Sequence, residues 1–128
     1  MAGPKLDGAG QVKMATLEDA MGQVQRLHGL VEVAALQVKG NKSIAAFGAQ
    51  FRRAASPLVG LLKPQFGLIA DIVSNMILVS SRGGGDQAKI RSMREGIGQL
   101  KAQLEIAATQ TKDKHAVKGE EQVGAEPA

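Results

Sequence analysis

Two histidines are the first candidates for chemistry in this chain of 128 residues, because imidazole titrates near neutral pH and is a common metal ligand. His28 falls within an apolar stripe at helical spacing, and His115 lies in a charged segment near the C-terminus. Neither has the other histidine one helical turn away, so the spacing does not form a metal-binding pair. We therefore interpret His28 as a core or interface residue and predict no metal site.

Other catalytic arrangements are also missing from the sequence. The chain has no cysteine, which excludes a thiolate nucleophile and a disulfide, and no Ser/His/Asp set has motif support. Histidine phosphotransfer domains carry a short Lys-Gly motif soon after the phospho-accepting histidine, whereas His28 is followed by Gly29-Leu30 and Lys39-Gly40 lies further downstream. Asp71 and Asn75, one turn apart, mark either an exposed strip or a buried polar contact. We predict no catalytic residue, no cofactor and no enzymatic activity.

The run Gly83-Gly84-Gly85 could expose backbone N–H groups to a phosphate, since a helix is predicted to begin directly after it. A phosphate-binding loop of the Walker type would follow a strand and continue with Gly-Lys-Ser or Gly-Lys-Thr. Here the preceding segment has helical periodicity and Asp86 comes next. The glycines are therefore predicted to form a turn between helices.

Basic side chains surround this turn. They are Arg82, Lys89, Arg91 and Arg94, opposed locally by Asp86 alone. Such a cluster could bind RNA, DNA, acidic lipid or an acidic protein, or it could be an ordinary solvated face. It contains no aromatic residue that could stack on bases, and the net charge of the chain is only +4.

The composition favours a helical core. Trp and Tyr are absent and Phe occurs three times, so the core must be built from Leu, Ile, Val, Met and Ala. These residues suit helix-on-helix packing, and the regular turns of a β-sandwich are not found.

The segment from about residue 17 to residue 39 is predicted to form the first long helix, with Thr16 as its N-cap. Its apolar stripe recurs at spacings of three and four: Leu17, Ala20, Met21, Val24, Leu27, Val31, Ala34, Ala35 and Val38. From Leu27 onward, Leu30, Val33 and Leu36 add apolar groups on the opposite side. That half should lie in the centre of a bundle or be covered by another chain.

The middle of the chain contains two prolines that bear on the number of helices. A helix should begin after Ser43 and break or kink near Ser56, because Pro57 lacks an N–H group. After Pro64, residues 65–81 form a very apolar segment, which we expect to be the central helix of the core.

The last helix is predicted over residues 87–111, with Asp86 as its cap. Its apolar residues form one narrow seam at alternating spacings of three and four: Ile90, Met93, Ile97, Leu100, Leu104 and Ala107. Such a seam is typical of an outer helix or of a coiled-coil partner.

Small residues recur every seven positions in two segments, at Ala15, Gly22 and Gly29 and again at Gly60, Gly67, Ser74 and Ser81. Glycine in a helix interior costs about 1 kcal/mol relative to alanine. The recurrence therefore favours close approach of neighbouring helices, unless small residues are simply scattered through the chain.

These patterns predict an all-α fold, an antiparallel bundle of three long helical segments, or of four helices if the chain breaks at Pro57–Pro64. Residues 16–111 form the predicted bundle domain, and residues 1–15 and 112–128 are predicted to be flexible tails.

The leading functional hypothesis is a non-enzymatic interaction or assembly protein that binds itself or a partner protein through apolar helix faces. The predicted partner-binding residues are Leu27, Leu30, Val33 and Leu36 on the first helix and Ile90, Met93, Ile97, Leu100 and Leu104 on the last. The alternative is a nucleic-acid-binding accessory protein that uses the Arg82–Arg94 region, and a third option is a peripheral membrane protein. We expect a cytoplasmic location, because the N-terminal residues contain no apolar run of the kind a secretory signal needs.

Overall fold

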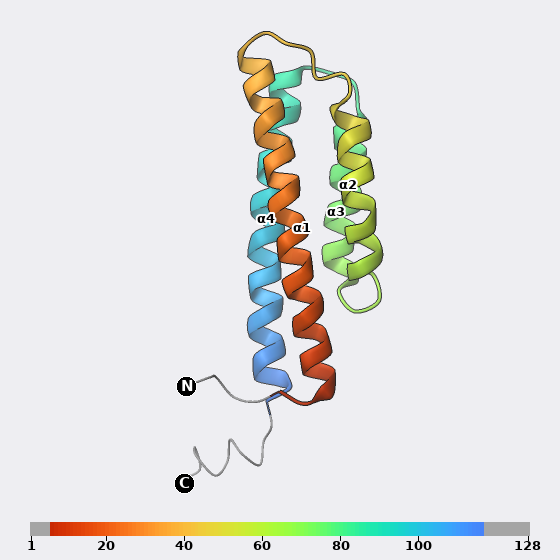
Figure 1. Ribbon diagram of the computed structural model, residues 1–128, viewed down its shortest axis with the longest axis vertical. Helices are drawn as coiled ribbons and strands as arrows, with labels where there is room; N and C mark the ends of the chain where they lie inside the picture. Colours follow the sequence, from red (N-terminus) through yellow and green to blue (C-terminus); the bar gives the residue numbers. More distant parts are fainter. Residues whose placement is uncertain (1–5, 117–128) are drawn as a thin grey trace.

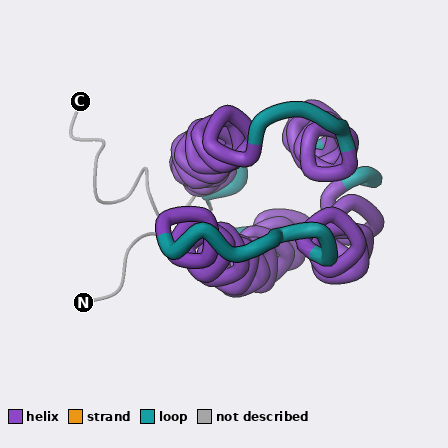
Figure 2. The backbone as a smooth tube through the Cα atoms, turned by 90° about the horizontal axis from the view of Figure 1, so that it is seen from above, coloured by secondary structure: helices purple, strands orange, loops and turns teal. Residues whose placement is uncertain are grey.

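The computed structural model describes residues 6–116, which form four α-helices and confirm the all-α bundle (Figure 1). The helices are α1 (Gly8–Lys39), α2 (Phe47–Leu62), α3 (Gly67–Ser81) and α4 (Asp86–Lys114). Seen from above, they stand at the corners of a rectangle (Figure 2). Helix α1 packs against α2 and α4, and α3 packs against the same two helices. Each helix is therefore antiparallel to both of its neighbours.

The core is built from one stripe of each helix, as the spacing of three and four predicts. Leu17, Val24, Leu27 and Val31 of α1 are at most 2% exposed. The rings of Phe47 and Phe51 in α2 lie 5.7 Å apart inside the same core. The expectation that residues 65–81 form the central helix is wrong, because Leu68 and Leu78 of α3 are 83% and 59% exposed.

Helix α2 runs through Pro57 without a break, so of the two predicted alternatives near Ser56, a break or a kink, the break is wrong. Pro57 lies on the exposed side of the helix, where the carbonyl group that lost its N–H partner can bind water. The flanking residues Ala55 and Leu58 are fully buried and hold the helix against the core. The chain instead leaves the helix at Leu62, just before Pro64, and this yields the fourth helix.

The first helix begins at Gly8, well before the predicted start near residue 17, so the assignment of residues 6–15 to a flexible tail is wrong. The N-cap is Asp7, whose carboxylate accepts a hydrogen bond of 2.7 Å from the Gly10 N–H. Thr16 lies inside the helix.

Contacts with the C-terminal end hold this early start in place. The Asp7 N–H donates to the His115 carbonyl at 3.0 Å, and Leu6 forms an antiparallel bridge with Ala116. Helix α4 extends to Lys114, three residues beyond its predicted end. The remaining residues of the two predicted tails, 1–5 and 117–128, lie outside the described residues.

The glycine run is a turn between two helices, as predicted, and Gly84 takes a φ of 120° that favours glycine. Asp86 is the first residue of α4 and Gly85 is the N-cap, one position from the predicted cap. Among residues 6–116, no helix combines the length and the hydropathy needed to cross a membrane.

Candidate functional site

The apolar seam of α4 is buried in the protein's own core. Ile90, Met93, Ile97, Leu100 and Leu104 are at most 5% exposed. Leu27 of α1 is fully buried as well, and Leu30 is half-buried and packs against the core. These seven predicted partner-binding residues are therefore covered within one chain, and the structure does not present them to a partner.

Val33 and Leu36, the two other predicted partner-binding residues, are 56% and 69% exposed. They belong to a longer exposed face of α1 on the side opposite its buried stripe, which we call the α1 outer face. Its members recur at alternating spacings of four and three, and all are exposed: Gly8, Val12, Ala15, Asp19, Gly22, Arg26, Gly29, Val33, Leu36 and Gly40, the last of which caps the helix. Positions at this spacing form one side of an α-helix, and eight of the ten residues here are small or apolar, which a neighbouring helix can approach closely.

The two glycines in the middle of the α1 outer face, Gly22 and Gly29, have no packing role within the described residues. A Cβ atom built on Gly22 or Gly29 would meet nothing within 4 Å, and the same holds for Gly60 and Gly67. The expectation that small residues at heptad spacing bring helices of this chain together is wrong for these four positions.

Two other glycines do sit at close helix crossings. A Cβ on Gly48 of α2 would lie 2.8 Å from the Ser80 backbone oxygen of α3. A Cβ on Gly96 of α4 would lie 2.7 Å from the Met76 sulfur of α3. Both crossings involve α3, and neither glycine belongs to the heptad series seen in the sequence.

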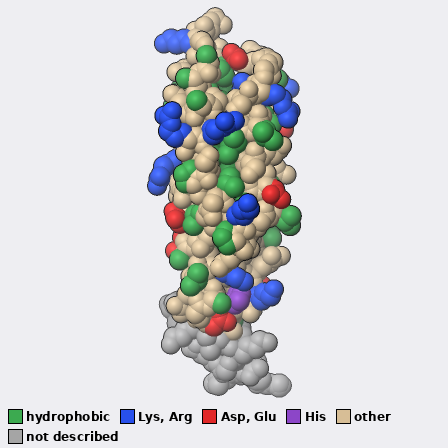
Figure 3. All heavy atoms as spheres, turned by 90° about the vertical axis from the view of Figure 1, so that its right-hand side faces the viewer, with side chains coloured by type: hydrophobic (Ala, Val, Ile, Leu, Met, Phe, Trp, Pro, Cys, Tyr) green, Lys and Arg blue, Asp and Glu red, His purple; other side chains and the backbone are tan. Residues whose placement is uncertain are grey.

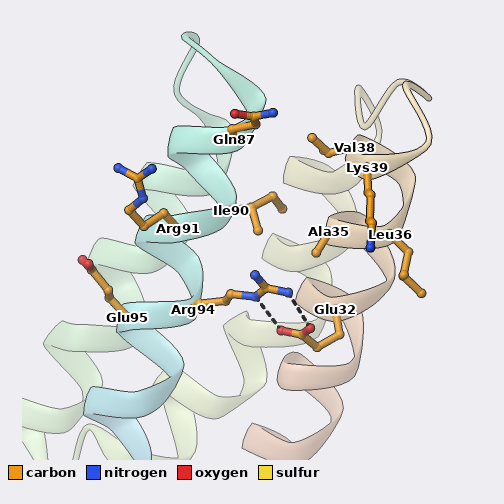
Figure 4. Close-up of a pocket in the computed structure, with 10 residues that line it drawn as sticks. All are labelled: Glu32, Ala35, Leu36, Val38, Lys39, Gln87, Ile90, Arg91, Arg94 and Glu95. Atoms are coloured by element: carbon orange, nitrogen blue, oxygen red, sulfur yellow. Dashed lines mark hydrogen bonds and ion pairs between the residues drawn. The ribbon is translucent and has the colours of Figure 1, made fainter.

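A groove of about 620 Å³ runs between the C-terminal half of α1 and the first turns of α4 (Figure 4). Ala35, Val38 and Ile90 supply apolar walls, and Leu36 lies at the edge. Arg94 reaches across to Glu32 and forms two hydrogen bonds of 2.8 and 2.9 Å. The groove therefore borders the C-terminal end of the α1 outer face, at Leu36.

This ion pair shifts the titration of both side chains. The hydrogen bond from Arg94 lowers the pKa of Glu32 below its ordinary value, and the same bond raises the pKa of Arg94. The guanidinium group of Arg94 is therefore engaged within the chain.

The structure divides the predicted basic cluster. Arg91 and Arg94 both border the groove, but only Arg94 of these two extends toward α1, whereas Lys89 borders a separate hollow beside Ser80 of α3. Arg82 caps the end of α3, and Arg91 points away from α1 in Figure 4. Because Arg94 is paired with Glu32 and Lys89 borders a different hollow from Arg91, the arrangement adds no support for a nucleic-acid interface.

Both histidines lie between α1 and α4. His28 lies beside the middle of α4, and His115 lies at its C-terminal end. The His28 Nδ1 accepts from the Lys101 Nζ at 3.1 Å, and its Nε2 is 3.8 Å from a Glu32 oxygen. This places His28 at a helix interface, as its stripe position predicts.

His115 follows α4 directly and does not lie in a free tail. Its Nδ1 lies 3.2 Å from the Asp7 carboxylate, and its Nε2 accepts from the Lys13 Nζ at 3.1 Å. The Gly10 N–H, and then His115 and Lys13, lower the pKa of Asp7. The His115 side chain therefore joins the start of α1 to the end of α4, which lie at the same end of the bundle (Figure 1).

Other polar candidates do not gather into a site. Asp71 and Asn75 are both exposed, which agrees with the exposed-strip interpretation. No group of three or more His, Cys, Asp and Glu residues in the described range lies close enough to hold a metal ion.

Comparisons of the chain with protein-family models, with curated proteins and with solved structures found no match. We therefore infer function from the surfaces of this chain alone.

Proposed function

We propose that this chain is a non-enzymatic interaction or assembly protein that binds another helix through the α1 outer face. The observation that carries the proposal is the exposed heptad series from Gly8 to Gly40 on the side of α1 that no other helix of the described chain covers. A second helix can pack on such a series, because its apolar side chains can enter gaps between residues of the partner and its glycines let the two backbones come close.

The apolar content of this face supports the proposal. Val12, Val33 and Leu36 are each more than half exposed and lie on one stripe. On the side that α2 and α3 present in Figure 3, hydrophobic side chains are dispersed among polar and charged ones. Single exposed apolar residues such as Leu78 are normal on folded proteins, whereas an aligned series on one helix favours a binding surface.

The glycines of the α1 outer face also support the proposal. Each glycine in an exposed helix interior lowers helix stability by about 1 kcal/mol relative to alanine. Gly22 and Gly29 gain no close contact within the chain to offset this loss. Close approach of a partner helix would supply that contact, because glycine lets two backbones come near each other.

Site-specific photo-cross-linking in the native cell tests the proposal. A photoreactive amino acid in place of Leu36 should give a discrete cross-linked protein product. The matched control places it at Leu78, which is similarly exposed but lies on α3. Equal cross-linking at the two positions, or none at Leu36, would contradict the proposed binding face.

A further inference from the structure

We infer that the helix bound by the α1 outer face is α1 of a second copy of this chain, running antiparallel about a two-fold axis near residue 24. The inference rests on the proposed function and names its partner. It rests on the order of apolar and charged residues along the α1 outer face. When two copies of the face run antiparallel, apolar residues lie opposite apolar residues, and acidic residues lie near basic residues.

The apolar residues lie at the two ends of the face. In an antiparallel pair, residues whose numbers have a constant sum lie opposite each other. Positions 12 and 36 sum to 48, as do 15 and 33, so an axis at residue 24 places Val12 opposite Leu36 of the second copy. Ala15 then lies opposite Val33 of the second copy. All four side chains are exposed in the single chain, and pairing removes them from water at both ends.

The charged residues lie in the middle of the face and have opposite signs. With the same axis, Asp19 and Arg26 of the second copy are offset by three residues, about 4.5 Å along the helix, which an arginine side chain spans. The symmetry creates this pair twice. Asp19 accepts a hydrogen bond of 3.3 Å from the Gln23 side chain, and Arg26 takes part in no ion pair among residues 6–116.

The glycines make room for these charged side chains. The axis places Arg26 opposite Gly22 of the second copy and Asp19 opposite Gly29 of the second copy. Because the two glycines have open space above them, the long Arg26 side chain can lie across the partner's backbone.

A parallel arrangement of the same face is disfavoured. It would place Asp19 beside Asp19 and Arg26 beside Arg26, and like charges in contact repel each other. The charge order therefore selects the antiparallel pair.

Sedimentation equilibrium of the purified full chain, from micromolar to millimolar concentration, tests the inference. The wild type should self-associate to a dimer, and Leu78→Glu, the control on α3, should dimerise equally well. Leu36→Glu should lose dimerisation, because it places a charge against Val12 of the second copy.

Charge reversal tests the register and the partner together. Asp19→Arg alone and Arg26→Asp alone should each weaken dimerisation by roughly tenfold, since two attractive pairs become repulsive. The double variant should restore dimerisation, and circular dichroism on every variant checks that the helices remain folded.

A wild type that stays monomeric over the whole concentration range would overturn the second copy as the partner. A double variant that associates no better than the single ones would overturn the antiparallel register. If the wild type is monomeric, the cross-linking experiment alone decides whether the proposed function holds. If Leu36 then still gives a specific product, the face binds a different protein, and if it does not, the proposed function fails as well.

Discussion

Two pairs of glycines inside helices differ in what surrounds them. Gly48 and Gly96 lie at crossings with α3, where a methyl group would touch a backbone oxygen or a methionine side chain. Gly22 and Gly29 lie on the α1 outer face, where a methyl group would touch nothing within 4 Å. The first pair is explained by packing within the chain, whereas the second pair has no such explanation. The glycines of the first pair belong to the packed interior of the bundle, whereas those of the second lie on the exposed face that we propose binds another helix.

The largest effect is expected from Gly48→Ala. The new Cβ would lie 2.8 Å from the Ser80 backbone oxygen, so α2 or α3 must shift. Such overpacking lowers the free energy of unfolding by about 1–3 kcal/mol, which urea denaturation measures. Gly60→Ala on the same helix is the matched control, since its Cβ meets open space and should stabilise the protein. Similar changes at both positions would show that the α2–α3 crossing is not tight.

Gly22→Ala and Gly29→Ala should act in the opposite direction. Each should raise the free energy of unfolding by about 0.5–1 kcal/mol, because alanine favours the helix and meets no neighbour. The two gains should add, since the sites are about 10 Å apart along the helix. Urea denaturation of dilute protein measures this, and a loss of stability would mean that the α1 outer face is already covered within the chain.

A smaller effect on stability is expected from removing the charge of Glu32, which pairs with Arg94 on the side of α1 that faces α4. The pKa of Glu32 in the folded chain lies below its ordinary value of 4.5, mainly because of the hydrogen bond from Arg94. The stabilisation is therefore present above the unfolded-state pKa and is lost as the pH falls through the folded-state pKa.

Glu32→Gln should consequently flatten the loss of stability below about pH 5, as measured by thermal unfolding over a pH series. Glu18→Gln, at another exposed carboxylate of α1, is the control. If both variants keep the wild-type pH profile, the Glu32–Arg94 pair adds nothing to stability.

The sequence predicted the helices and most core residues, because an apolar stripe with spacings of three and four, such as the one through Leu17, Val24 and Val31, is satisfied by a helix that buries one side. The early start of α1 could not be predicted in this way. Asp7 is followed by glycines, and the cap is held by His115, which is 108 residues away along the chain. Pro57 was misjudged because its exposure, which makes the missing hydrogen bond tolerable, depends on the tertiary structure.

The candidate binding face was predicted only in part. Periodicity shows that the α4 seam must be covered, but it does not show whether the same chain or another covers it, and here α1 and α3 do. On α1, the run of apolar residues after Leu27 drew attention to Val33 and Leu36. The sequence also showed the series Ala15, Gly22 and Gly29, but only the position of the buried stripe shows that this series and Val33 and Leu36 lie on the same exposed side.

The most direct test of the antiparallel pairing is a distance measurement by pulsed electron spin resonance. The chain has no cysteine, so a spin label can be attached to a single cysteine introduced at an exposed position of α1. Gln25→Cys lies next to the proposed axis, and Gln37→Cys lies near the end of the helix.

In the antiparallel pair, labels at position 25 should lie close together, whereas labels at position 37 should be separated by about 39 Å along the helix axis. Short distances at both positions would indicate a parallel pair, and the absence of any distance between copies would show that the α1 outer face does not bind a second chain.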